Sequence, residues 1–288
     1  DRERLLRIIG ERIGHPITIS LIRRSLLTPT VPSNARHPEY KRYLKERGIP
    51  QGLAISNILA AIYLREVDTA MEPFGVNYRR YVDDILMYGD EQSVRKAHKS
   101  LVARLRHRKL SLHPLGSSKN YISALTTPFG YLGYYFRWPT VTVRDSTVER
   151  LLQSIAAKFS DYLHNKENRR RRFQYLTTDR LKETFLQELN ERITGAISEG
   201  KRYGWIAYFS EINDLSLLYK LDTIIKRIFE RMPDFGYIAP GELKRFSRAY
   251  YEMKFNLHGG YVRDYDKIST RADKLEFLVN RGRISPDE

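Results

Sequence analysis

The sequence contains no cysteine among its 288 residues. Disulfide bonds, iron–sulfur clusters and zinc sites with thiolate ligands are therefore excluded from these residues. The chain also lacks any apolar run near the roughly 20 residues that a membrane-spanning helix needs, and its first residues, DRERLLRIIG, do not resemble a signal peptide. We therefore expect a cytoplasmic protein without a membrane partner.

Acidic residues are also comparatively few. The 34 Asp and Glu residues face 50 Lys and Arg residues, which gives a formal net charge of +16. Such an excess is typical of proteins that bind polyanions such as nucleic acid or an anionic membrane surface, and of these two we expect nucleic acid. The apolar content of 41% excludes disorder over most of the chain, and the length suits two domains or one large domain with an appendage.

Hydrophobic periodicity predicts helices in the first part of the chain. The first helix begins at once, with Asp1 as its N-cap. Ser56 is expected to cap a second helix, whose apolar residues fall on one side as far as Val67. A basic helix is predicted over roughly 91–109.

Two β-prone segments interrupt this helical pattern. The run NYRRYVDDILMYGD at 77–90 consists of two short strand-like stretches around Asp83-Asp84, which predicts a hairpin with these two acids as its connection. The run FGYLGYYF at 129–136, followed by TVTV, predicts a second hairpin with its turn near Pro139.

Beyond residue 140 the pattern becomes helical and basic. Ser146 and Glu149 form a capping box ahead of an amphipathic helix, and a further apolar stripe covers 214–230. We place a domain boundary near residue 140, between an α+β unit and a helical unit.

The adjacent acids Asp83 and Asp84 are the strongest chemical signal in the chain. Two carboxylates held together repel each other, and a hard divalent cation such as Mg²⁺ relieves the repulsion. Asp-Asp is also a poor hairpin turn, because neither residue is glycine. The pair therefore indicates a role other than turn formation at this position. An exposed polar turn that happens to be acidic is the alternative, and the pair alone does not exclude it.

The pair Asp83-Asp84 belongs to a series of five sequence blocks that follow one another along the chain. They are GIPQGLAIS at 48–56, ILAAIYLREVD, RRYVDDILMYGD, LSLHPLGSSKN and FGYLGYYF. In order and spacing they resemble the palm of reverse transcriptases of the group II intron, retron and bacterial abortive-infection (defence-associated) lineage, with YVDD as the YxDD box. The resemblance covers about residues 1–136. The segment 204–231 is similar to the thumb and maturase-like region of that lineage, and the tail after 232 resembles the abortive-infection branch only loosely.

The resemblance implies roles for the residues around the acidic pair. Asp83 and Asp84 would be catalytic and would bind two Mg²⁺ ions for nucleotidyl transfer. Tyr81 would lie near the primer end or the incoming nucleotide, and the strand period of two places it on the face of Asp83.

Three further blocks acquire roles in the same way. Gln51 and Gly52 would line the pocket of the nascent base pair, where glycine allows the backbone to approach a nucleotide closely. Lys119 would donate a proton to the pyrophosphate leaving group, and Phe129 to Phe136 would form the primer grip. Each also has a simpler explanation: an ordinary loop for Gln51-Gly52, a solvated cation for Lys119 and core packing for the aromatic residues.

The arginine run 169–172 is the clearest cationic cluster of the helical part. A run of this kind is most often a solvated helix face, but phosphate contact is a reasonable expectation beside a polymerase. The expected partners are an RNA template with a DNA primer, or an RNA–DNA duplex, and a dedicated noncoding RNA is a further partner that the resemblance suggests.

One element of the family's pattern is expected upstream of residue 1. In the family, the third metal ligand sits in a preceding strand, within a block resembling D-I-x-x-F-F-x-x-I-D, and DRERLL matches the residues that follow the isoleucine of this block. Asp1 then aligns with the second, non-ligand aspartate, and the fingers would also lie upstream. The alternative, in which Asp1 is itself a metal ligand, fits less well with Leu5 and Leu6 following so soon.

The sequence as a whole predicts an α+β protein with a right-hand polymerase palm, an antiparallel sheet and helices. The palm would cover 1–140, a helical thumb or maturase-like region 141–231, and a helical extension 232–288. The expected function is RNA-directed DNA synthesis with Mg²⁺, in a mobile element or in antiphage defence. An RNA-binding maturase or an incomplete polymerase-like scaffold is the alternative, and DNA synthesis without a template or primed on protein is a third possibility.

Overall fold

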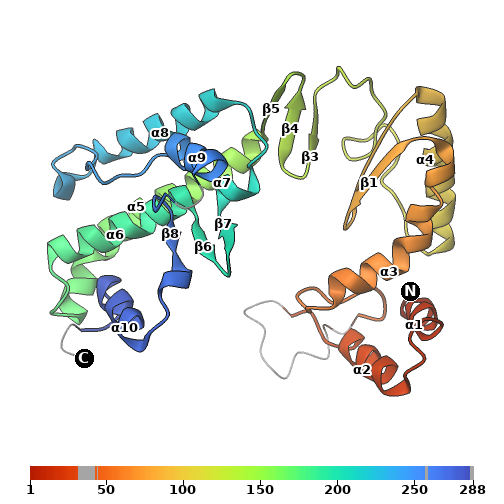
Figure 1. Ribbon diagram of the computed structural model, residues 1–288, viewed down its shortest axis with the longest axis horizontal. Helices are drawn as coiled ribbons and strands as arrows, with labels where there is room; N and C mark the ends of the chain where they lie inside the picture. Colours follow the sequence, from red (N-terminus) through yellow and green to blue (C-terminus); the bar gives the residue numbers. More distant parts are fainter. Residues whose placement is uncertain (32–42, 44, 257–258, 286–288) are drawn as a thin grey trace. The chain divides into compact units, whose positions relative to one another are not determined.

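A computed structural model describes residues 1–31, 43, 45–256 and 259–285 (Figure 1). The chain forms two compact units, Asp1–Leu125 and Thr126–Glu288. Both contain helices and small sheets, so the expected α+β class is confirmed. The division falls before the second predicted hairpin and not near residue 140, because Val143 of that hairpin is buried in the core of the second unit. The assignment of palm and thumb to segments of the chain stays a prediction.

The first unit consists of four α-helices, a 3-10 turn and one hairpin in the described residues. In chain order they are α1 (Arg2–Gly10), α2 (Pro16–Leu26), α3 (Ser56–Thr69), η2 (Glu72–Phe74), β1 (Asn77–Tyr81), β2 (Asp84–Tyr88) and α4 (Glu91–His107). Asp1 caps α1 as predicted, since its side chain accepts a hydrogen bond from the amide of Arg4. The predicted cap at Ser56 is wrong: Ile55 is the N-cap, and the Ser56 hydroxyl donates to the carbonyl of Pro50 at 2.6 Å.

Helix α3 links the two small hydrophobic clusters of this unit. Its first part, with Leu59 and Tyr63, packs with α1 and α2. Its last part, with Val67, packs with α4, and the hairpin residues Ile85 and Met87 lie against this second cluster. Helices α3 and α4 therefore form the support on which the β1–β2 hairpin rests.

The second unit begins with a three-stranded antiparallel meander. Its strands are β3 (Phe129–Tyr131), β4 (Tyr134–Arg137) and β5 (Thr140–Val143). The predicted turn at Pro139 is confirmed, because Arg137 pairs with Thr140. A second turn, at Leu132-Gly133, was not predicted. Both of its residues have positive φ, +51° and +85°, which is the geometry of a two-residue hairpin loop.

Helices make up most of the remaining second unit. They are α5 (Asp145–Arg172), α6 (Thr178–Thr194), α7 (Trp205–Tyr208), α8 (Leu215–Phe229), η3 (Pro233–Phe235), α9 (Phe246–Phe255), η4 (Tyr265–Lys267) and α10 (Arg271–Asn280). The predicted capping box at Ser146 and Glu149 is wrong, because α5 already begins at Asp145 and its N-cap, Arg144, makes no side-chain capping bond. A small sheet in the order β7 (Lys201–Tyr203), β6 (Ala196–Ser198), β8 (Arg263–Asp264) includes one parallel pair, which the sequence patterns did not predict.

One continuous core joins helices α5 to α9. The apolar stripe predicted near 214–230 is confirmed, since Leu218, Leu221, Ile225 and Phe229 of α8 are all buried. Phe159 of α5 meets Phe185 and Phe229 edge to face, with ring centroids 5.0 and 5.1 Å apart. Aromatic pairs in this arrangement add stability beyond the area that they bury.

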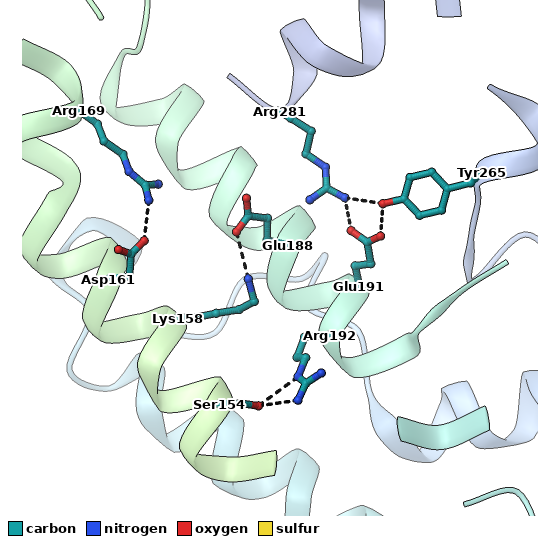
Figure 2. A network of polar contacts seen from close by, with 9 residues as sticks. All are labelled: Ser154, Lys158, Asp161, Arg169, Glu188, Glu191, Arg192, Tyr265 and Arg281. Atoms are coloured by element: carbon teal, nitrogen blue, oxygen red, sulfur yellow. Dashed lines mark hydrogen bonds and ion pairs between the residues drawn. The ribbon is translucent and has the colours of Figure 1, made fainter. Parts of the chain in front are cut away.

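Polar contacts tie the C-terminal segment to α6. Glu191 pairs with Arg281 and accepts a hydrogen bond from the hydroxyl of Tyr265 (Figure 2). Burial, followed by this bond to Glu191, raises the pKa of Tyr265. Within the described residues, no helix combines the length and apolar character that a bilayer span requires.

Candidate active site

The tip of the β1–β2 hairpin carries the acidic pair, but in a different register from the predicted one. Tyr81 pairs with Asp84, so Val82 and Asp83 form the two-residue connection and Asp84 begins β2. The predicted connection Asp83-Asp84 is therefore wrong by one residue. Val82 has φ of +54°, at a turn position that normally favours glycine. A β-branched residue held there is strained, at a cost on the order of 1–3 kcal/mol.

This register also changes which acid lies beside Tyr81. Residues directly opposite each other in an antiparallel pair share one face of the sheet, so Asp84 is the neighbour of Tyr81. The predicted shared face of Tyr81 and Asp83 is wrong, because Asp83 belongs to the turn and the strand period ends before it. Tyr81 is 58% exposed, so it is available to a ligand.

Both carboxylates of the tip are open to solvent. Asp83 and Asp84 are exposed, and within the described ranges neither makes an ion pair or a side-chain hydrogen bond. Oxygen ligands are what Mg²⁺ prefers, and it is commonly held by one or two carboxylates together with substrate phosphates. The two residues therefore fit such an ion. In the part of the chain that the structure describes, no three His, Asp or Glu side chains group into a metal site.

A polar contact from α3 holds this tip in place. The guanidinium of Arg80 donates two bonds to the carboxylate of Asp68, at 2.7 and 2.6 Å, and a third to the carbonyl of Val82 at 2.8 Å. The bond to Asp68 is the main reason why the pKa of Arg80 is raised. Sequence reasoning missed these residues, although both lie in blocks that carry the resemblance: Asp68 in ILAAIYLREVD and Arg80 in RRYVDD.

Gln51 and Gly52 lie in an exposed turn that leads into α3. Gly52 has φ of +88°, which the backbone of other residues rarely adopts, and the space around it would admit a Cβ atom. The glycine is thus required by the turn itself. Close approach of a ligand, the predicted reason for glycine, remains a prediction.

Lys119 is exposed in a short turn after α4. The turn is fixed by Asn120, whose side chain donates to the carbonyl of His113 at 2.7 Å and whose amide donates to Ser117. Among the described residues, no ion pair or hydrogen bond involves the Lys119 side chain or connects it to the hairpin. The structure thus brings Tyr81, Asp83 and Asp84 together in one hairpin, while Gln51-Gly52 and Lys119 occupy separate loops of the same unit.

The aromatic block Phe129 to Phe136 lies in the second unit. Phe129 and Phe136 face each other across the β3–β4 ladder and stack at 4.9 Å. The hydroxyl of Tyr134 donates to the carbonyl of Tyr208 at 2.7 Å. Much of the block therefore packs within the unit, and its predicted contact with a primer is not tested by these contacts.

The arginine run occupies the last turn of α5. Arg169 pairs with Asp161 at 2.6 Å (Figure 2), and Arg170 lies 3.5 Å from Glu167. Arg172 stacks over the ring of Phe173 at 5.2 Å. Cations at a helix C-terminus are also favoured by the helix dipole. Part of this run is thus engaged in the fold, and Arg171 and Arg172 have no acidic partner in the described segments.

The carboxylate of Asp1 is already occupied. One oxygen accepts from the amide of Arg4, and the other pairs with the ammonium of Lys109. These contacts give Asp1 a role in capping α1, and they disfavour the alternative in which it binds a metal ion.

The hairpin lies in a part of the chain that matches a known protein family. Residues 11–136 match the family model described as reverse transcriptase (RNA-dependent DNA polymerase). The match indicates a reverse transcriptase domain. This domain is an RNA-directed DNA polymerase, and it includes Gln51, Gly52, Lys119 and the hairpin with its two acids. No curated protein matches the chain. The arginine run lies outside the matched reverse transcriptase segment, and membership of the group II intron, retron or abortive-infection lineage stays a prediction.

Proposed function

We propose that the chain copies an RNA template into DNA, by Mg²⁺-dependent transfer of nucleotides from deoxynucleoside triphosphates to a primer 3′-hydroxyl. One observation supports this most strongly. Within the matched segment, a strained hairpin presents Asp83 and Asp84 to solvent without a partner in the described residues. Exposed, adjacent carboxylates that no cation neutralises are suited to a hard divalent ion.

The reaction is an in-line displacement. The primer 3′-oxygen forms a bond to the α-phosphorus, and the bond from that phosphorus to the leaving pyrophosphate breaks. Asp83 and Asp84 would hold Mg²⁺, which when bound lowers the pKa of the hydroxyl and neutralises phosphate charge. Tyr81, exposed beside Asp84, offers a ring surface to the primer end or the incoming nucleotide.

The loops of the same unit would complete the reaction. Gln51 and Gly52 would line the pocket of the nascent base pair. Lys119 is exposed and carries a proton that it would transfer to the departing pyrophosphate.

Nucleic acid would be held mainly by its phosphates. Arg171 and Arg172 are the members of the 169–172 run with no acidic partner in the described residues, and the net charge of +16 favours a polyanion. Binding through phosphates is tolerant of sequence and weakens with salt. An RNA template with its DNA primer fits these features, and we propose a dedicated noncoding RNA as a further partner. The biological setting would be a mobile element or antiphage defence.

A second function has one specific observation in its favour. Two candidate metal-binding carboxylates lie at the hairpin, and the described residues contain no cluster of three His, Asp or Glu side chains. An RNA-binding maturase or polymerase-like scaffold would retain the shape of the domain without needing a complete metal site.

Primer extension on an RNA template, with and without Mg²⁺, separates the two functions. Asp83→Asn is expected to lower the rate of DNA synthesis at least about 100-fold, because a metal ligand contributes at least as much as the groups that orient it. RNA affinity should stay unchanged. The matched control is Glu72→Gln, which removes an exposed acid of the same unit away from the hairpin tip. Undiminished synthesis by Asp83→Asn would overturn the proposal, and RNA binding without synthesis by the unmodified protein would support the second function.

A further inference from the structure

Arg80 connects the core of the first unit to the turn that carries the acids. It lies in β1, and its side chain is only 12% exposed. Two of its nitrogens reach Asp68 of α3, and the remaining terminal nitrogen donates to the carbonyl of Val82 at 2.8 Å. Because a guanidinium is planar and rigid, the paired bonds to Asp68 also fix the direction of the third bond.

Asp68 is itself firmly held. It accepts a hydrogen bond from the hydroxyl of Tyr78 at 2.9 Å, in addition to the two from Arg80. Its neighbour Val67 and the nearby Met71 are buried in the cluster that packs α3 against α4. A rigid link therefore runs from this core through Asp68 and Arg80 to the backbone of Val82.

The turn at Val82 needs such a link. Its φ of +54° is unfavourable for a β-branched side chain. In the described residues β1 and β2 pair only with each other, so no further strand braces the hairpin tip. Without Arg80, Val82 would be expected to relax toward negative φ, and the carboxylates of Asp83 and Asp84 would change their relative orientation.

We propose that Arg80, oriented by Asp68, is a positioning residue for the acidic pair. Its guanidinium keeps the Val82 carbonyl in place and so holds both carboxylates in the arrangement that binds divalent metal. This inference rests on the proposed function of the hairpin. A purely structural ion pair between Arg80 and Asp68 would instead affect unfolding and leave metal affinity unchanged.

The test uses the full chain with Mn²⁺ as the probe, because its binding can be followed by electron paramagnetic resonance without turnover. Arg80→Gln is expected to weaken Mn²⁺ binding by about 10- to 100-fold and to slow nucleotide incorporation by a similar factor, the range typical of groups that orient metal ligands. RNA affinity should not change. Arg80→Lys should fail to restore metal binding, because an ammonium has no fork to reach Asp68 and Val82 together.

Arg79→Gln is the matched control. Arg79 is the exposed neighbour in the same strand, and its guanidinium donates only to the adjacent Tyr78 carbonyl among the described contacts. The Arg79→Gln variant removes the same charge from the same strand. Equal losses of Mn²⁺ affinity in Arg79→Gln and Arg80→Gln would therefore show that the effect comes from net charge alone, and would overturn the inference.

Val82→Gly provides a rescue that a structural role would not produce. Glycine adopts positive φ without strain, so the turn should depend less on its support. In the Arg80→Gln background, Val82→Gly is expected to recover part of the lost Mn²⁺ affinity. No recovery would contradict the role that we assign to the Val82 turn.

The outcomes separate this inference from the proposed function. If the unmodified protein neither binds Mn²⁺ nor makes DNA, the proposed function fails. If it does both and Arg80→Gln matches it, the inference is overturned and the proposed function stands. If circular dichroism shows that Arg80→Gln does not fold, the Asp68→Asn variant tests the inference instead. This variant keeps the shape of the pair and is expected to weaken Mn²⁺ binding by a smaller factor than Arg80→Gln. Unaltered Mn²⁺ binding by Asp68→Asn would refute the inference.

Discussion

Acidic side chains in the two units of the molecule are used differently. In the second unit, Glu191 is paired with Arg281 and Tyr265, and its side chain is only 22% exposed. At the hairpin tip of the first unit, Asp83 and Asp84 are exposed and have no partner in the described residues. Paired acids stabilise the fold that contains them, whereas adjacent unpaired acids repel each other and weaken it. This contrast supports the proposal that the tip serves ligand binding rather than stability.

The largest difference should appear in unfolding experiments. Glu191→Gln is expected to lower the free energy of unfolding by about 1–3 kcal/mol, because it leaves the mostly buried guanidinium of Arg281 without its charged partner. Asp83→Asn should leave stability unchanged or raise it slightly, because it removes repulsion. Chemical denaturation of both variants tests the contrast, and a clear loss of stability in Asp83→Asn would break it.

Glu183→Gln is the control for the paired acid. Glu183 also faces an arginine, Arg180, but its side chain is 59% exposed. Exposed pairs contribute at most about 1 kcal/mol. If Glu183→Gln lowered the free energy of unfolding as much as Glu191→Gln, burial would not determine how much these ion pairs contribute to stability.

The same contrast between engaged and unengaged charges applies within the arginine run. Replacing Arg171 and Arg172 together by Gln is expected to weaken binding to an RNA–DNA duplex and to reduce the slope of log affinity against log salt by about 1 for each phosphate that is no longer neutralised. Replacing Arg169 and Arg170 should change the slope less, because Asp161 and Glu167 already neutralise them. Binding titrations at several salt concentrations measure the slopes. Equal slopes for the two double variants would show that the internal pairs are broken when nucleic acid binds.

The smallest expected effect concerns pH. Burial is the largest influence on Asp234 and raises its pKa, but hydrogen bonds from Lys166 and Tyr162 together outweigh it, so the pKa is lowered from 3.8. The stabilisation by Asp234 is therefore fully present above pH 3.8 and is lost as pH falls from there through the folded-state pKa. In the Asp234→Asn variant, the free energy of unfolding should fall less steeply as the pH decreases below 3.8, which denaturation at several pH values measures. The same decrease in the variant and the unmodified protein would show that Asp234 does not contribute to it.

The sequence predicted those parts of the fold that depend on local pattern. The stripe of α8 and the cap at Asp1 were found, because periodicity and capping are properties of neighbouring residues. The cap at Ser56 was missed because its hydroxyl reaches the carbonyl of Pro50, a contact that motif rules do not include. The small parallel pair of β6 and β8 joins segments far apart in the chain, so no local signal marks it.

At the hairpin, the sequence marked the two acids as candidate site residues, a role that stays a prediction, but it did not reveal the register of the turn. The YVDD box marked Asp83 and Asp84, yet turn rules placed the bend on the two acids because valine is disfavoured at positive φ. The bond from Arg80 to the Val82 carbonyl is one reason why that rule fails here. Such a contact depends on how α3 packs beneath the hairpin, and periodicity carries no information about it.

The most direct measurement of the central claim is metal binding by the hairpin itself. Mn²⁺ titrations of the full chain, followed by electron paramagnetic resonance, would compare it with Asp83→Asn, Asp84→Asn and the exposed control Glu72→Gln. We predict that the unmodified protein and Glu72→Gln bind Mn²⁺ alike, with Mg²⁺ competing, and that each aspartate variant binds at least about tenfold more weakly. Equal affinities in all four proteins would contradict a metal site at the hairpin tip.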